Sequence, residues 1–396
     1  MNKNVLVAEA NALGMIAVIR SLGEAGYRVF AIAPAPDALG FYSTFTSYYK
    51  CHPPYIDSEF VPWLRYYIEC NDIQMIVPSE GFLQAISAAY DEFSPLLPDT
   101  VDVEVVSTCL SKVATQARLK ARLPELDWHI PVGGAVSSEA ELSQLAVDDS
   151  MGTGPFFVKA DAEKAKANTG SKVIFCKDIQ ALQHHVRQLL PGYYSLLWQE
   201  YVPGKKVGVS LWRHQGQFMA ESMVLGIHMQ PWTGGMMSLR ESFWHEAILA
   251  DARKKMEALD WQGVAMMEYK WEPETDRFWF IEINARFWGY LHLDLYAGKN
   301  YPRLQTDAFF GHVVKNLGPP DRKVVCRHTV PGEIGYLLSR LRSRQPATWQ
   351  KWRSVAGFFT RFLDFRIKSD LWYPGDRMLY VRSWVAYFKS MFFTKN

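Results

Sequence analysis

The sequence predicts an α/β domain with a parallel sheet, then an α+β core, then a mostly helical C-terminal extension. Strands and helices alternate in residues 1–108, antiparallel hairpins follow in residues 109–316, and residues 317–396 are basic and aromatic. The 396 residues suffice for two or three lobes. The hydrophobic share of 48% is large enough to form buried cores, so a disordered chain is excluded.

The charge of the chain is nearly balanced overall but divided between its two ends. Lys and Arg number 43 against 41 Asp and Glu, which gives a formal net charge of +2. From residue 320 onward, however, 15 Lys and Arg face 5 Asp and Glu. The overall balance argues against a protein that coats nucleic acid, and the split indicates that the two regions face different partners.

Five cysteines stand singly, with no Cys-x-x-Cys pair, which is typical of a reducing compartment. Glu9 interrupts the apolar N-terminal segment before a secretory core could form, and no apolar run approaches the length of a membrane-spanning helix. We therefore expect a cytoplasmic protein.

The first region reads as two β-α-β cycles. Strands are expected at residues 5–8, 28–33 and 74–77, and helices at 14–26 and 60–69. Ligands of parallel sheets bind at the carboxyl ends of the strands, where Asn11 and Glu80 would lie. The turn at residues 9–14 holds one glycine and no G-x-G-x-x-G pattern, which argues against a dinucleotide site. P-loop, HExxH and GxSxG motifs are also absent from the sequence.

The middle region combines helices with hairpins. Residues 110–145 look helical and connecting, with a turn at the Gly133–Gly134 pair. Strands are expected at residues 155–159, 171–176, 196–204 and 207–212, with a polar loop at 161–169 between the first two.

The most informative stretch is residues 263–286, which reads as two strands joined by a turn at 273–277. If the turn centres on Thr275, Glu268 lies directly opposite Glu282, and Asn284 shares the face of Glu282. Like charges opposite each other destabilise a sheet by about 0.2–1 kcal/mol. A solvated hairpin is the alternative, but Val264 and Phe280 are typical of a covered sheet.

A divalent cation would explain this pairing. Two carboxylates and an amide oxygen are ligands that suit Mg²⁺ or Mn²⁺ shared with nucleotide phosphates. Arg286, two residues after Asn284, is placed to neutralise a phosphoryl oxygen.

With these residues the hairpin resembles the metal-binding strands of the ATP-grasp superfamily, and in particular its carboxylate–amine ligase-like members. The resemblance covers residues 1 to about 316. It implies that Glu268, Glu282 and Asn284 hold Mg²⁺ or Mn²⁺ across the phosphates of ATP, and that Arg286 contacts the transferred phosphoryl group.

Further segments resemble the family in the expected order. The resemblance implies that Lys112 and Lys159 are nucleotide lysines, that Ser171 ends the flap over the phosphates, and that Arg240 meets the acyl phosphate. It also implies that adenine binds at the hinge of Gln199, Glu200, Tyr201 and Val202. The flap has no glycine from residue 161 to 169, and Lys205-Lys206 follows the hinge where relatives often have an acidic residue.

The resemblance implies an ATP-dependent ligase that joins a small carboxylate to an amine through an acyl phosphate. An ATP-binding protein without turnover, and a carboxylase or kinase on the same fold, are the alternatives. The cleft between the first two regions would take the second substrate, with Asn11, Ser43, Glu80 and Arg303 as candidate lining residues.

The tail matches no motif. Residues 331–396 hold 15 aromatic residues interleaved with Lys and Arg. We expect helices that pack on the core and expose a basic outer surface. The alternative is a contact with anionic lipid or with an acidic protein, which would make the protein peripheral to a membrane. The sequence does not indicate an oligomeric state.

Overall fold

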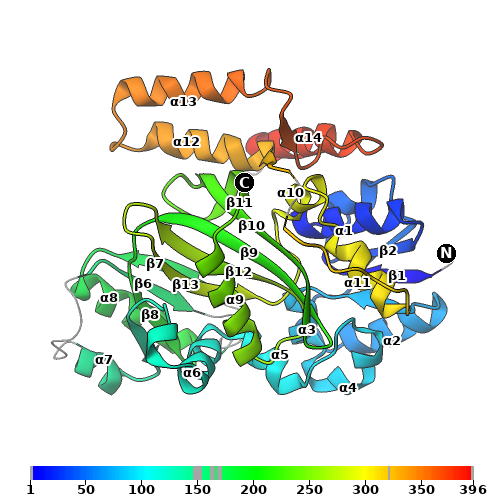
Figure 1. Cartoon of the computed structure of the whole chain (residues 1–396), viewed down its shortest axis with the longest axis horizontal. Coiled ribbons are helices and arrows are strands. Elements are labelled where there is room, and N and C mark those ends of the chain that lie inside the picture. Colours follow the sequence, from blue (N-terminus) through cyan, green and yellow to red (C-terminus); the bar gives the residue numbers. More distant parts are fainter. Residues whose placement is uncertain (1–2, 146–153, 161–165, 167–171, 320–321, 394–396) are drawn as a thin grey trace.

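Three β-sheets organise the computed structural model, which describes residues 3–145, 154–160, 166, 172–319 and 322–393 (Figure 1). Helices of the first region surround a small parallel sheet, and a second small sheet faces the large central one. The C-terminal helices lie together at one end of the molecule (Figure 1). This arrangement confirms the predicted order of an α/β domain, an α+β core and a largely helical extension.

The first sheet has four parallel strands in the order β3-β2-β1-β4. Helices cover both faces of this sheet, so that all of β1 and nearly all of β2 are buried. Burial on both faces is why these two strands are continuous apolar runs. The elements are β1 Asn4–Val7, α1 Leu13–Glu24, β2 Arg28–Ala33, β3 Tyr48–Cys51, α2 Phe60–Cys70, β4 Met75–Val77, α3 Glu80–Ala85, α4 Tyr90–Phe93 and α5 Val103–Leu110.

The second sheet has four antiparallel strands in the order β5-β8-β6-β7. Phe156, Val158 and Trp198 alternate onto one face and form a core with α8. The predicted turn at Gly133–Gly134 is wrong, because these residues begin strand β5, where a side chain at Gly133 would collide with the Trp198 carbonyl. The elements are α6 Lys112–Arg122, β5 Gly133–Val136, α7 Glu139–Leu145, β6 Phe156–Ala160, β7 Lys172–Cys176, α8 Ile179–Leu189 and β8 Leu196–Glu200.

The central sheet has seven strands in the order β13-β12-β9-β10-β11-β14-β15. Its first five strands are antiparallel neighbours, and β14 pairs in parallel with β15. The strands are β9 Lys205–His214, β10 Gln217–Gln230, β11 Met236–Phe243, β12 Gly263–Glu272, β13 Arg277–Asn284, β14 Val325–Arg327 and β15 Ile367–Ser369. The helices are α9 Glu246–Ala258, α10 Leu291–Tyr296, α11 Tyr301–Phe309, α12 Ile334–Arg342, α13 Thr348–Thr360 and α14 Met378–Phe393.

The three predicted regions share elements rather than folding side by side. The boundary after residue 108 falls inside α5. Strands β14 and β15 lie beyond residue 317 but extend the central sheet next to β11. The C-terminal extension is therefore built into the core through these two strands, and its helices follow from them.

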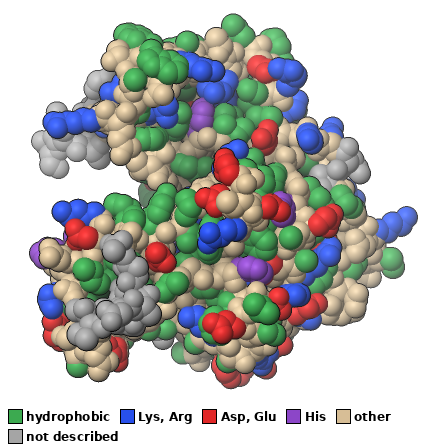
Figure 2. All heavy atoms as spheres, turned by 60° about the vertical axis from the view of Figure 1, so that its left-hand side comes forward, with side chains coloured by type: hydrophobic (Ala, Val, Ile, Leu, Met, Phe, Trp, Pro, Cys, Tyr) green, Lys and Arg blue, Asp and Glu red, His purple; other side chains and the backbone are tan. Residues whose placement is uncertain are grey.

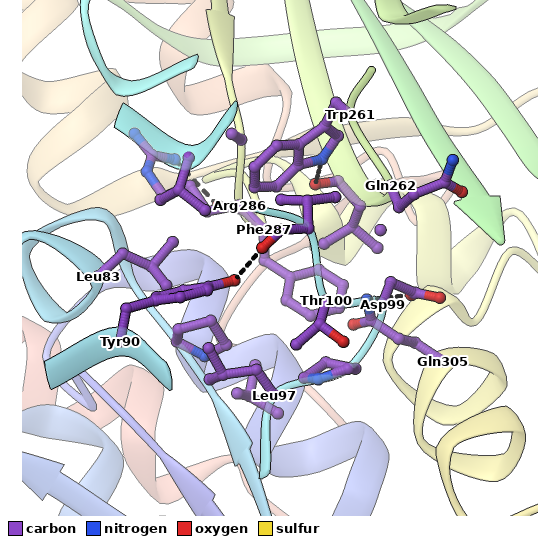
Figure 3. A pocket seen from close by; sticks show the side chains of 18 residues that line it. Leu83, Tyr90, Leu97, Asp99, Thr100, Trp261, Gln262, Arg286, Phe287 and Gln305 are labelled. Atoms are coloured by element: carbon purple, nitrogen blue, oxygen red, sulfur yellow. Dashed lines mark hydrogen bonds between the residues drawn. The ribbon is translucent and has the colours of Figure 1, made fainter. Parts of the chain in front are cut away.

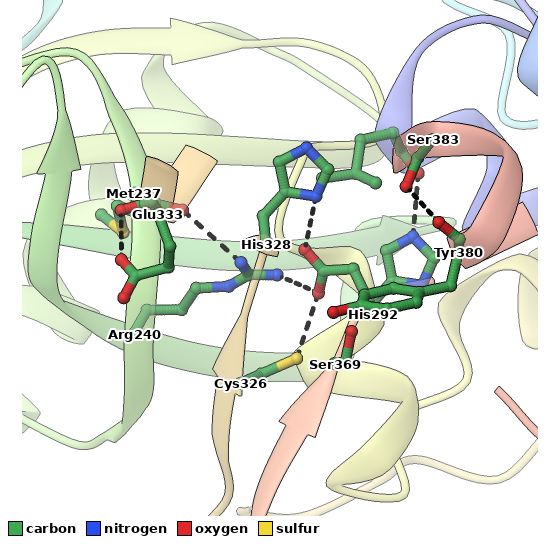
Figure 4. Close-up of polar contacts among 12 residues, drawn as sticks. Met237, Arg240, His292, Cys326, His328, Glu333, Ser369, Tyr380 and Ser383 are labelled. Atoms are coloured by element: carbon green, nitrogen blue, oxygen red, sulfur yellow. Dashed lines mark hydrogen bonds and ion pairs between the residues drawn. The ribbon is translucent and has the colours of Figure 1, made fainter. Parts of the chain in front are cut away.

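A buried ion pair fixes the extension to the central sheet. Arg240 of β11 and Asp370, which follows β15, are both fully buried and bind each other. The Cys326 thiol donates to the same carboxylate at 3.0 Å, and His328 Nδ1 lies 3.6 Å from its second oxygen (Figure 4). Burial alone would raise the pKa of Asp370, but the charge of Arg240 outweighs it and keeps this pKa below its ordinary value.

The backbone of Asp370 is tied to the first region through Arg20 of α1. The Arg20 guanidinium donates to the Asp370 carbonyl at 3.1 Å and to His292 Nδ1 at 2.9 Å, and it stacks on the Tyr373 ring at 3.5 Å. His292 Nε2 lies 3.0 Å from the Leu13 carbonyl, so this nitrogen carries the proton and Nδ1 accepts. Burial, with help from Arg20, lowers the pKa of His292 well below its ordinary value.

We expect Asp370→Ala to destabilise the fold by about 3–5 kcal/mol, because it leaves the Arg240 guanidinium buried without its counter-charge. The measurement is the midpoint of urea unfolding followed by circular dichroism. Asp364→Ala is the control, since Asp364 binds Arg366 at the surface and its removal should change the midpoint little. Equal midpoints for the two variants would contradict the importance of the buried pair.

Candidate active site

Two glutamates face each other across the hairpin of β12 and β13. Glu268 pairs directly with Glu282, and Met266 pairs with Asn284. The register near the turn differs from the prediction by one residue, since Glu272 pairs with Arg277. A β-bulge next to Glu268 then restores the predicted pairing. The two carboxylates therefore share one face of the central sheet, and Asn284 lies two residues beyond Glu282 on that face.

Lysines from two other elements neutralise these carboxylates. Lys206 of β9 places Nζ 2.6 Å from Glu268 Oε2, and Lys112, the first residue of α6, places Nζ 3.7 Å from Glu282 Oε2. Burial would raise the pKa of Glu282, but Lys112 and other nearby cations outweigh burial and hold this pKa below its ordinary value. Glu282 is thus kept as a carboxylate despite the neighbouring Glu268.

The second sheet presents Lys159 toward the same region. Lys159 of β6 is buried, and its Nζ donates to Gln199 Oε1 on β8 at 2.6 Å. Its charge also acts on Glu282, which lies on the facing sheet. Gln199 is 2% exposed, and its Nε2 has no hydrogen-bond partner within the described ranges. A buried amide donor of this kind is costly unless a ligand accepts from it.

An apolar shelf surrounds Lys159 and Gln199 on this face. The register pairs Phe157 with both Phe175 and Gln199, so these side chains point the same way. Phe175 is 53% exposed, and the Tyr201 ring lies 6.1 Å from that of Phe157. Exposed aromatic rings beside a buried amide form a surface that suits a flat heterocycle such as a purine.

The predicted hinge is arranged differently from the expectation in one respect. The backbone N–H groups of Glu200 and Tyr201 donate to the carbonyls of Val132 and Pro155, at 2.7 and 2.8 Å. Neither N–H is therefore open to a ligand, which leaves Val202 and the carbonyls of this segment for such a contact. Ser171 and residues 161–165 and 167–170 of the predicted flap lie outside the described residues.

Arg286 connects the hairpin to the first region. Its guanidinium donates to Asn284 Oδ1 at 2.9 Å and to the Phe287 carbonyl at 2.9 Å, and it approaches the Glu80 carboxylate at 3.3 Å. Glu80 begins α3, directly after the carboxyl end of β4. The predicted position of Glu80 at a strand end therefore brings it into contact with the candidate site.

A polar cavity of about 210 Å³ lies between these parts of the chain. Glu80, Lys112, Glu282 and Arg286 contribute its charged lining, and Asn284 and Gln116 line it as well. A second cavity, of about 40 Å³, is lined by the Arg286–Phe287 segment and by Tyr90, Trp261 and Asp99, among others (Figure 3). That volume holds only a few waters at most, so the larger, charged cavity is the candidate for substrate.

Other predicted residues lie apart from this cavity. Arg240 shares the sheet, but its guanidinium is fully buried against Asp370, so its predicted contact with an acyl phosphate is not formed in this arrangement. Ser43 donates to Asp376 of the extension at 2.6 Å, and Arg303 lies at the surface near Asp307. Asn11 is exposed on the turn after β1. Ser43 therefore serves a contact between elements of the fold, and Arg303 pairs within its own helix α11.

The donor set fits a hard divalent cation. Two carboxylates in register and the amide oxygen of Asn284 match the ligands that Mg²⁺ uses when phosphates complete its coordination. Within the described part of the chain no group of three or more His, Cys, Asp and Glu residues forms a self-sufficient metal site.

Lys206 provides a charge at this site that the sequence did not predict. The signal for Lys206 is its register, because it lies two residues before Gly208, which pairs with Glu268. That signal depends on knowing which strands are neighbours. Gln199, part of the predicted hinge, lies on the face opposite the core residue Trp198, as the alternation of side chains along a strand requires.

No family model and no curated protein sequence matches this chain. Solved structures do. The L-amino acid ligase from Bacillus licheniformis has 14% identity and a TM-score of 0.61, covering 82% of this chain and 79% of its own. The N5-carboxyaminoimidazole synthetase from Staphylococcus aureus, in complex with ADP, has 14% identity and a TM-score of 0.61. The match covers 82% of this chain and 83% of that enzyme.

The biotin carboxylase from Campylobacter jejuni has 15% identity and a TM-score of 0.61, and the match covers 82% of this chain and 75% of that enzyme. These three structures are ATP-grasp proteins. Since each likeness spans about four fifths of the chain, the chain has the ATP-grasp fold.

Proposed function

We propose that this protein is an ATP-dependent ligase that joins a carboxylate to an amine through an acyl phosphate. The observation that carries the proposal is the pair Glu268 and Glu282, which is held in register with Asn284 and surrounded by cations from three elements. The ATP-grasp fold and the similarity to an L-amino acid ligase support it.

ATP would bind between the second and the central sheet. The shelf of Phe157 and Phe175 suits the adenine ring. Beside it are the hinge at Glu200, Tyr201 and Val202 and the Gln199 Nε2 group, which has no partner among the described residues. Lys159 and Lys112 face the carboxylate pair and would bind phosphate oxygens. Ser171 would contribute to the flap over the phosphates.

Glu268, Glu282 and Asn284 would hold Mg²⁺ or Mn²⁺. A cation at this place would neutralise the phosphate oxygens and orient the γ-phosphoryl group. For this to happen Lys206 must leave Glu268, which a flexible lysine side chain can do by rotation.

The substrates would meet in the cavity beside Arg286. The substrate carboxylate attacks the γ-phosphorus of ATP, ADP leaves, and an acyl phosphate forms. The amine then attacks the acyl carbon and expels phosphate while losing a proton. Positioning and charge neutralisation by Arg286, Lys112 and Lys159 serve both steps, and no nucleophilic side chain is required.

A second candidate function is ATP-dependent carboxylation, because the similar structures include a biotin carboxylase and carboxyaminoimidazole synthetases. In that case bicarbonate takes the place of the substrate carboxylate. Mass spectrometry of the product separates the two functions, since ligation of a larger acid adds that acid to the amine, whereas carboxylation adds only CO₂.

We expect Glu282→Gln to reduce substrate-dependent ADP release at least 100-fold, because an uncharged amide cannot replace a carboxylate ligand at the phosphates. The measurement is a coupled ADP assay over pairs of carboxylates and amines. Glu274→Gln, in the exposed turn of the same hairpin, is the control and should keep full activity. Full turnover by Glu282→Gln would reject the proposed role.

We expect Lys206→Met to strengthen Mn²⁺ binding in the absence of nucleotide, because Glu268 then loses the ammonium group 2.6 Å away. Electron paramagnetic resonance of free Mn²⁺ measures this affinity. Lys205→Met is the matched control, since the Lys205 side chain points to the face of β9 opposite that of Lys206. If both variants bind Mn²⁺ like the unaltered protein, Lys206 does not compete for the cation.

A further inference from the structure

The C-terminal extension leaves an apolar stripe on the outer side of α13. Trp349, Trp352 and Phe359 recur at helical spacing and are 62%, 68% and 62% exposed, and Leu363, just after the helix, is 76% exposed. The opposite side of the helix packs inward through Phe358, which is buried. The exposed side chains are therefore a separate face of the helix and do not belong to its packing core.

Helix α14 repeats this arrangement. Leu379 and Ser383 are buried on its inner side. Its outer side carries large apolar residues that are 45–60% exposed, namely Met378, Val381, Val385, Phe388 and Met391. Both helices lie at the same end of the molecule (Figure 1). We refer to the exposed sides of α13 and α14 and the basic residues among them as the tail surface.

The charge exposed around the tail surface is almost entirely positive. Residues 334–393 contain 11 Lys and Arg but only three acidic residues. Asp370 and Asp376 are buried, and Asp364 binds Arg366 at 2.8 Å. Figure 2 shows Lys and Arg side chains next to hydrophobic ones over this end of the molecule. With Asp370 and Asp376 buried and Asp364 paired, the acidic residues of this segment balance little of its basic charge.

We propose that the tail surface binds the surface of an anionic lipid bilayer. Exposed Trp and Phe on one side of a helix, flanked by Lys and Arg, match the boundary between lipid headgroups and acyl chains, where aromatic rings insert and cations meet phosphate. None of the described helices is long and apolar enough to cross a membrane. The helices would therefore lie in the plane of the bilayer surface.

Charge favours a lipid surface over a second copy of the chain as the occupant. Two tail surfaces brought together would place like charges against each other, which costs free energy. An anionic bilayer presents the opposite charge over an extended area. The surface is also preformed, because the ion pair of Arg240 and Asp370 and the bond from Ser43 to Asp376 hold the extension on the core.

The test is binding of the full chain to phosphatidylcholine vesicles with and without phosphatidylglycerol, measured by co-sedimentation and by tryptophan fluorescence. We expect binding only to the anionic vesicles, with a blue shift as Trp349 and Trp352 leave water. The double variant Trp349→Ser, Trp352→Ser should weaken binding at least tenfold. Tyr66→Ser is the control, because Tyr66 is 68% exposed elsewhere and should not affect binding.

The charge contribution is tested by changing Arg342, Arg344 and Arg353 to Gln. Each basic residue near an anionic surface adds about fivefold to partitioning, so the triple variant should bind about 100-fold more weakly. Lys177→Gln is the control, since that side chain is 81% exposed away from the extension.

Other outcomes would overturn the proposal. One is absence of binding to anionic vesicles by the folded chain. Another is self-association in solution that is lost in the double tryptophan variant, which would assign the surface to a second copy. These results do not depend on ATP turnover, so the membrane proposal and the ligase proposal are tested separately.

Discussion

The pairing of Glu268 with Glu282 is the constraint around which the candidate site is arranged. Two carboxylates in direct register repel each other, and an isolated hairpin would lose stability from them. Three lysines offset this repulsion, namely Lys206 from the neighbouring strand, Lys112 from the start of α6 and Lys159 from the facing sheet. Three separate elements therefore place cations beside these two side chains.

This arrangement leaves the site ready for a more highly charged ligand. We propose that the lysines that balance the glutamates turn toward phosphate when a divalent cation binds the carboxylates. Arg286 is held more firmly, since it contacts Asn284, Glu80 and the Phe287 carbonyl at once. It is thus the cation whose position links the first region to the hairpin.

The sequence predicted the parallel sheet and the glutamate pair because both depend on local periodicity. The strand at residues 28–33 is found with the predicted bounds, and the hairpin turn lies where expected. Partners distant in the chain could not be predicted in this way. Arg240 follows a glycine-rich segment like a ligand-binding residue, yet its partner is Asp370, which lies 130 residues later. Likewise, Lys206 gains its role from the register between β9 and β12.

The same long-range contacts explain the positive charge of the tail. Asp370 enters the core to bind Arg240, and Asp376 is buried where Ser43 and the Thr44 N–H donate to it. Both acids are thus removed from the surface by the contacts that fix the extension to the body. Most Lys and Arg residues of the same segment stay exposed, whereas Arg340, Lys351 and Arg361 are half-buried. Burial of these two acids adds to the excess of Lys and Arg that the segment already has, and exposed aromatic side chains add the apolar part of the proposed interface.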